Sequence, residues 1–340
     1  MQKNKNMQAE GLRGLACLII VMFHTIYQFQ VFVLGQQGPS LFAHWGEIGV
    51  GIFLFISGFF LVDFSNKSKF SLLQFYKRRI LRLWPIYATC VFLIFVIRML
   101  TTVPNFEPVN WSDLILNISF INGFIGTQYI EPAHWYMTTL LRATIVIGAL
   151  RRTGLHKYTE TYGLWLLLIV GMKILQRTIT STALQSLIHV VLTVTGGAYT
   201  GVFVLAFLMR KLFVCENIHD LFRRENWKEL LVLGMSIIFL LGLPGIIYTI
   251  VILGGGLLVW LCMKKKLPIM DNRLLTGVAK ISFVWYLIHQ YISYYIEMMI
   301  LSIVNNQIVA SSTAILITMT MSIVIHYLIE LPIQGRIVRT

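Results

Sequence analysis

The chain has 340 residues, of which 57% are hydrophobic and 12% are charged. Apolar runs of about 18 residues recur along it, the length that crosses the hydrocarbon core of a bilayer, which excludes a soluble globular protein. The net charge of +14 does not indicate a nucleic-acid partner, because the lysines and arginines lie in short clusters between apolar runs. Clusters of this kind are typical of the cytoplasmic loops of membrane proteins.

The first apolar run, residues 12–34, contains two ionisable side chains, Arg13 and His24. They are eleven residues apart, so on a helix they share one face, roughly 16 Å apart along the axis. Ionisable groups inside a membrane helix are costly and mark a functional site by default. We interpret the pair as part of a site that extends from the cytoplasmic edge into the bilayer. A cleaved signal peptide is not expected, since the run is long and both residues interrupt it.

The apolar runs predict ten membrane spans. They cover residues 12–34, 46–64, 82–101, 132–150, 160–177, 187–209, 229–243, 246–263, 276–301 and 308–329. All lysines and arginines lie on one side of this arrangement except Arg98, Arg142, Lys173 and Arg177. By the positive-inside rule that side, with both termini, faces the cytoplasm. The sequence therefore predicts an all-α, polytopic membrane bundle that forms a single domain over residues 1–340, with no appended soluble domain.

The stretch 113–127 is apolar but short. Counting it as a span would place Arg151 and Arg152 outside, so we expect a half-helix or re-entrant segment on the outer side. Such a segment is tolerated at membrane depth only where protein buries it.

The four cysteines do not form a recognisable pattern. Cys17, Cys90, Cys215 and Cys262 show no Cys-x-x-Cys pair and no cysteine–histidine spacing typical of zinc sites. We expect neither a disulfide nor a bound metal.

Five motifs in sequence order resemble those of the integral-membrane acyltransferase 3 family. They are Leu12-Arg13-Gly14 with Phe23-His24, the Phe-rich run 49–59 with Ser57-Gly58-Phe59, the basic run 75–85 with Arg78, Arg79 and Arg82, Tyr286-Leu287-Ile288-His289, and Glu330-Leu331-Pro332. The resemblance covers almost the whole chain. One departure occurs at Trp135, where many members carry a glutamate five residues later and this chain has Leu140. The role of that carboxylate is therefore not carried over.

The resemblance implies an enzyme of the bacterial plasma membrane. Members commonly transfer acetyl from acetyl-CoA to a sugar hydroxyl of a cell-surface polysaccharide or its lipid-linked precursor. A polysaccharide or small-molecule transporter is the alternative, because ten spans with buried polar residues also suit transport. The chain shows no internal repeat, and a transporter needs no phosphate site at the inner face. A membrane sensor without chemistry is a further alternative.

His24 and Arg13 are the candidate catalytic residues. Imidazole has an ordinary pKa near the working pH, so His24 suits removal of the proton from an attacking hydroxyl. Arg13 suits a CoA phosphate or the orientation of the site, because its planar fork matches phosphate oxygens. The alternatives are a histidine that packs helices together and an arginine that anchors the helix at the headgroups.

The basic segment and Ser57 are the candidate donor site. Arg78, Arg79 and Arg82 lie on an expected amphipathic helix at the inner interface, where they would hold the phosphates of acetyl-CoA. Binding of anionic membrane lipids is the alternative. Ser57 is expected to donate a hydrogen bond or orient substrate rather than act as nucleophile, since no Gly-x-Ser-x-Gly elbow surrounds it.

Five residues, His289 among them, are candidates for binding the glycan acceptor. Glu47, Glu131, Trp135 and Glu297 lie near the expected outer face. Carboxylates and aromatic rings are suited to binding sugars. Tryptophan is also common at membrane interfaces for other reasons. His289 lines the site or bonds a backbone carbonyl. Glu330, at the inner end of the last span, is expected to pair with a basic residue.

Overall fold

The structure is a computed structural model that describes residues 6–62, 64, 70–197, 199–213, 224–242 and 245–339. All regular elements in these ranges are helices, so the predicted all-α class is confirmed. Seven helices of the described part are long and apolar enough to cross a membrane. They are Met7–Val33, Ser40–Leu61, Leu72–Leu100, Thr182–Leu212, Ile246–Met263, Arg273–Val304 and Gln307–Gly335. The polytopic membrane type is thereby supported, and the count of ten spans stays a prediction.

The chain divides into two compact units that interleave along the sequence. Unit 1 comprises Met1–Val50, Lys77–Tyr136 and Cys262–Thr340, and unit 2 comprises Gly51–Tyr76 and Met137–Leu261. Four helices contribute residues to both units: α2 (Trp45–Leu61), α3 (Leu72–Leu100), α6 (Trp135–Thr153) and α12 (Ile246–Met263).

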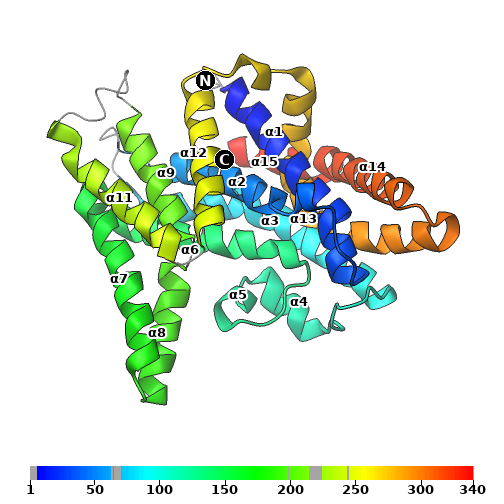
Figure 1. The fold of residues 1–340 in the computed structure, drawn as a ribbon, viewed down its shortest axis with the longest axis horizontal. Helices are drawn as coiled ribbons and strands as arrows, with labels where there is room; N and C mark the ends of the chain where they lie inside the picture. The colour runs from blue at the N-terminus through cyan, green and yellow to red at the C-terminus, as the bar shows by residue number, and fades with distance from the viewer. Residues whose placement is uncertain are drawn as a thin grey trace. The chain divides into compact units, whose positions relative to one another are not determined.

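Unit 1 is built around one long helix, α13 (Arg273–Val304). Helix α1 (Met7–Met22), its continuation η1 (Phe23–Val33), the short η3 (Pro132–His134) and α14 (Gln307–Ile325) all pack on it; α1 and α14 are visible beside it in Figure 1. The remaining elements of unit 1 are η2 (Ser40–Phe42), α4 (Trp111–Ile118), α5 (Asn122–Ile125), η6 (Pro268–Met270), η7 (His326–Glu330) and α15 (Leu331–Arg339).

Asparagine side chains cap the N-termini of four helices of unit 1, including α4. Asn6, Asn272 and Asn306 cap α1, α13 and α14, and each accepts a hydrogen bond from a backbone N–H two or three residues later. The caps satisfy donors that a helix N-terminus leaves unpaired, so they fix where each helix starts.

Two glycines bring α1 into backbone contact with η6 and α13. A Cβ at Gly11 would lie 1.7 Å from the carbonyl oxygen of Met270, and one at Gly14 would lie 2.0 Å from that of Leu275. Only glycine fits at such distances. This close approach is what small residues permit between membrane helices.

The stretch between α3 and η3 folds back on unit 1 as the two short helices α4 and α5. Asn110 and Asp113 form a reciprocal capping box at the start of α4, and Gly126 ends α5 with a left-handed φ of 76°. Arg98, which the positive-inside pattern leaves as an exception, donates to the carbonyl oxygens of Ile130 at 2.7 Å and Glu107 at 2.5 Å. The Arg98 guanidinium thus binds the backbone of this stretch and does not belong to a cytoplasmic basic loop.

Unit 2 is a second helical bundle. Its elements include α6 (Trp135–Thr153), η4 (Leu155–Lys157), α7 (Thr159–Thr178), α8 (Thr182–Thr195), α9 (Thr200–Leu212), η5 (Arg224–Asn226), α11 (Trp227–Gly242) and α12 (Ile246–Met263). Helices α7 and α8 form a hairpin (Figure 1), and α11 packs on α7 and α9. An ion pair of 2.8 Å joins Lys211 of α9 to Glu229 of α11, and Thr159 of α7 donates to the same carboxylate at 2.6 Å.

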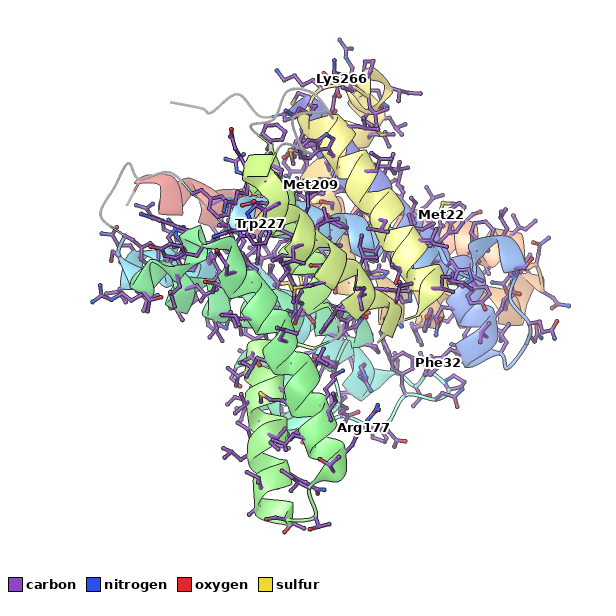
Figure 2. The ribbon with its side chains drawn as sticks, turned by 60° about the vertical axis from the view of Figure 1, so that its left-hand side comes forward. Met22, Phe32, Arg177, Met209, Trp227 and Lys266 are labelled. Atoms are coloured by element: carbon purple, nitrogen blue, oxygen red, sulfur yellow. The ribbon has the colours of Figure 1, made fainter. Side chains whose placement is uncertain are left out.

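Unit 1 separates its basic end from the loops that are expected outside. Figure 2 shows Lys266 and Phe32 at opposite ends of this unit, with Met22 between them. The loop that carries Lys266 meets the start of α1, where the Leu267 N–H donates to Gln8 at 2.9 Å. At the other end Asn105 donates to the Phe32 carbonyl. Which membrane face each loop occupies stays a prediction.

Candidate active site

The helix geometry changes at His24. Helix α1 is α-helical up to Met22, and the residues from Phe23 to Val33 form a π-helix, between the labels of Met22 and Phe32 in Figure 2. Segments of π-helix are rare and occur often at functional sites. His24 is the second residue of this segment and is half-buried.

His24 lies against His289, a residue 265 positions later in the chain. The centroids of the two imidazole rings are 4.9 Å apart, and His24 Nδ1 lies 3.4 Å from the hydroxyl of Tyr294. Helices α1 and α13 run side by side in the same direction, because Arg13, which precedes His24, contacts Ala279, which precedes His289. Two residues that the sequence predicts for one site are thus brought together.

His289 lies beside His24, and one of its ring nitrogens is free to accept a hydrogen bond. Its Nδ1 lies 2.7 Å from the carbonyl oxygen of Tyr286. A carbonyl only accepts, so Nδ1 carries the hydrogen, and in the neutral ring Nε2 is left as an acceptor. This Nε2 is buried and has no hydrogen-bond partner among the described residues. The backbone bond and the site role expected for His289 are therefore compatible, since the first fixes the tautomer for the second.

Two side chains before α6 bind the turn of α13 that carries His289. The carboxylate of Glu131 accepts from the Tyr291 N–H at 3.2 Å, and His134 Nε2 donates to the Leu287 carbonyl at 2.9 Å. Within a regular helix that N–H and that carbonyl are partners of each other. We call Glu131 and His134 the η3 clamp, because they hold the same two backbone atoms from outside the helix. Both side chains are fully buried.

Further contacts fix the η3 clamp on unit 1. The guanidinium of Arg98 donates to the Ile130 carbonyl and lies 5.2 Å from the ring centroid of Tyr291. The Tyr286 hydroxyl donates to the Ala133 carbonyl. Sequence reasoning selected Glu131 but missed His134 and the role of Arg98. The signal for His134 was its position three residues after Glu131, which gives two ionisable groups at one end of a predicted span.

Arg13 makes contacts within unit 1. Its Nη2 donates to the Ala279 carbonyl at 2.8 Å and lies 2.8 Å from the carboxylate of Glu10. Its Nε is buried without a hydrogen-bond partner among the described residues. Part of the guanidinium therefore holds α13, and one N–H group is left for a ligand.

The three arginines of the predicted donor site lie in the first turns of α3. Arg78 and Arg82 are exposed, and Arg79 is half-buried. Residues three and four apart on a helix are neighbours on its surface, so the group forms one basic patch. Its exposure suits an anionic ligand.

The other predicted residues have contacts of their own. Glu47, in the first turn of α2, lies 3.6 Å from His44. Trp135 is half-buried at the start of α6, with its ring 6.5 Å from that of Tyr136. Ser57 belongs to unit 2.

Glu330 has the basic partner that was expected. His326 Nδ1 lies 2.6 Å from its carboxylate, in the second π-helical segment η7.

Metal-ligating side chains do not gather in the described part of the chain. No group of three or more His, Cys, Asp or Glu residues there could hold a metal ion. Cys17, Cys90 and Cys262 are free thiols, and Cys215 lies outside the described residues.

Comparison with protein families decides the class of this site. The acyltransferase 3 model, described as an acyltransferase domain, matches residues 8–330. The chain belongs to the acyltransferase 3 family. The match begins in α1 and ends at Glu330, so the matched range contains the His24–His289 pair, the η3 clamp and the arginines of α3. No curated protein and no solved structure matches the chain. Membership of the acyltransferase 3 family supports an acyltransferase and does not favour the transporter alternative.

Proposed function

We propose that this acyltransferase 3 protein transfers an acetyl group from cytoplasmic acetyl-CoA to a hydroxyl of a cell-surface polysaccharide or its lipid-linked precursor. The observation that supports this is the pair of adjacent imidazoles, His24 and His289, on the two central helices of unit 1. Transfer from a thioester to a hydroxyl requires a base for the hydroxyl proton, and imidazole fills that role at neutral pH.

His24 acts as the base in this mechanism. It takes the acceptor's hydroxyl proton as the oxygen attacks the thioester carbonyl carbon. The new C–O bond forms, the C–S bond breaks, and the proton passes from His24 to the leaving CoA thiolate. His289 Nε2 accepts a hydrogen bond from a neighbouring hydroxyl of the acceptor and so orients the sugar. Bonds and protons balance in this direct transfer, which needs neither a covalent enzyme intermediate nor a metal ion.

The phosphates of acetyl-CoA are assigned to the basic residues of the inner face. Arg13 contributes its Nε–H, and Arg78, Arg79 and Arg82 contribute the basic patch on α3. Ser57 stays a candidate to donate a hydrogen bond to acetyl-CoA. Charge-assisted contacts between guanidinium and phosphate are among the stronger hydrogen bonds of proteins.

Replacement of Arg82 by glutamine is expected to weaken acetyl-CoA binding. Loss of one charge-assisted contact costs about 1.5–3 kcal/mol, or roughly 10- to 150-fold in affinity. Equilibrium binding to purified protein measures the effect, and it should shrink with acetyl-3′-dephospho-CoA as ligand. Lys77→Gln is the matched control, because Lys77 is an exposed cation in the same turns of α3. An equal loss with both ligands would show that Arg82 only anchors the helix.

The glycan is assigned to the outer side. Glu47, Glu131 and Trp135 bind it there, while acetyl-CoA enters from the cytoplasm through the opposite face of a plasma-membrane protein with ten spans and cytoplasmic termini. The separation of Lys266 from Phe32 supports this two-sided arrangement (Figure 2).

Thiol labelling tests the sidedness. Single cysteines at Gln37, Asn105, Ser68 and Lys265 are introduced into a cysteine-free background; Ser68 lies outside the described residues. A membrane-impermeant maleimide applied to intact cells should label the first two and leave the others unlabelled, since basic loops face the cytoplasm. Permeabilised cells provide the control in which all four react. The reverse pattern would overturn the two-sided mechanism and leave the enzyme class intact.

One experiment tests the function as a whole. Mass spectrometry of surface glycans from cells with and without the gene should show acetyl esters that depend on it. Acetyl-CoA binding by the purified protein should accompany them. A gene-dependent change in glycan export with no acetyl ester would instead support a transporter.

A further inference from the structure

One face of α13 carries four buried polar atoms that have no hydrogen-bond partner among the described residues. They are His289 Nε2, Gln290 Oε1, Ser293 Oγ and Glu297 Oε1. None of these residues is more than 6% exposed. At 100° and 1.5 Å per residue, the four positions span an arc of about 100° and about 12 Å of the helix axis. We call this set the α13 polar stripe.

Other serines of α13 donate their hydroxyl hydrogen to a backbone carbonyl of the same helix. Ser282 is equally buried, and its Oγ donates to the Ala279 carbonyl at 2.8 Å. Ser302 likewise donates to the Met299 carbonyl at 2.8 Å. The free Oγ of Ser293 departs from this pattern. Unpaired polar atoms inside a membrane protein are costly, because no lipid group replaces water as their partner.

The carboxylate of Glu297 is fixed so that one oxygen stays available. Its Oε2 accepts from Gln307 Nε2 at 3.0 Å and from Ser311 Oγ at 3.1 Å, both on α14. The same Ser311 Oγ lies 3.3 Å from the carbonyl oxygen of Thr25, the residue after His24. The stripe therefore lies beside the start of η1 and leads from His289 to a carboxylate held at the junction of η1, α13 and α14.

The chemistry of the free atoms selects the kind of ligand. His289 Nε2, Gln290 Oε1 and Glu297 Oε1 are acceptors, so their partner must donate hydrogens. A phosphate cannot do this when ionised, which excludes the CoA phosphates from the stripe. A sugar fits, because each hydroxyl donates to one acceptor and can accept from the hydroxyl of Ser293.

We propose that the α13 polar stripe is the acceptor subsite, in which neighbouring hydroxyls of one sugar unit bind Ser293 and Glu297. The hydroxyl to be acylated then lies at His289 and His24. The Glu297 end of α13 is the end remote from the basic loop 264–266, so the sugar enters from the face that is expected outside. The inference rests on the proposed function and deepens it, since it moves the acceptor contacts from surface residues such as Glu47 to the interior of unit 1.

Two substitutions in the full-length membrane protein test the subsite. Ser293→Ala and Glu297→Gln should each lower the acetyl-ester content of surface glycans by about fivefold or more, as expected for loss of one hydrogen bond to a substrate hydroxyl. Acetyl-CoA binding by the purified variants should stay within about twofold of wild type, a margin below the cost of any one such bond. Ser282→Ala is the matched control, because it removes a buried serine hydroxyl of α13 that has its own partner.

The outcomes separate the subsite from the proposed function. Unchanged glycan acetylation in both variants overturns the subsite, and so does a parallel loss of acetyl-CoA binding. Should Glu297→Gln reduce the amount of inserted protein, Ser293→Ala decides alone, because it deletes only one oxygen atom. If wild-type protein neither binds acetyl-CoA nor produces gene-dependent acetyl esters, the proposed function itself fails and the subsite with it.

Discussion

His24→Ala is expected to lower acetyl transfer by roughly 100-fold or more while the protein stays inserted and folded. General-base catalysis contributes about 10²–10⁴-fold in enzymes, and a methyl group at this position cannot accept the hydroxyl proton. The loss should appear in the rate of transfer with acetyl-CoA saturating, because the imidazole contacts the acceptor rather than the CoA phosphates. The initial rate per inserted protein, in membranes of a host that lacks the gene, measures it.

Two further variants make that result specific. His24→Gln retains a hydrogen-bonding side chain but no base, so its rate should be as low as that of the alanine variant. His189→Ala is the control, because His189 is an exposed histidine of unit 2. Transfer at a near-normal rate by well-inserted His24→Ala protein would show that the histidine only packs helices.

The helical periodicity of the first span explains what could be predicted there. Arg13 and His24 share a face because their spacing is close to three full turns, and the structure turns that face toward α13. The π-helix that starts at Phe23 could not be predicted, since an amino-acid pattern with a period near 3.6 residues does not reveal a wider turn. His24 retains its expected face because it lies at the junction, before the altered geometry accumulates.

The partners of the buried polar groups could not be predicted. Arg98 and His134 bind backbone carbonyls, and no pattern of side chains indicates which carbonyl a distant residue will meet. Glu131 was selected as a sugar ligand, yet one of its oxygens accepts from the Tyr291 N–H. The meeting of His24 with His289 likewise depends on the packing of α1 on α13, which follows from Gly11 and Gly14 only once the opposing backbone is known.

The η3 clamp explains how one turn of α13 can hold His289 in a fixed orientation. The bond from His289 Nδ1 to the Tyr286 carbonyl keeps the ring in one tautomer, and the next carbonyl, that of Leu287, is held by His134. Positioning through such contacts matters for rate, because displacement of a reacting group by about 1 Å costs about 100-fold in an enzyme.

Removal of the His134 contact is therefore expected to slow acetyl transfer without weakening the binding of acetyl-CoA. His134→Leu, which keeps the bulk of the side chain but donates no hydrogen bond, should lower the transfer rate by up to about 100-fold. Acetyl-CoA affinity should be unchanged, because His134 contacts α13 and not the basic residues of the inner face. His134→Gln retains an N–H donor that can reach the Leu287 carbonyl, so it should restore much of the rate. Equal rates for the leucine and glutamine variants, at equal amounts of inserted protein, would show that His134 fills space and does not position His289.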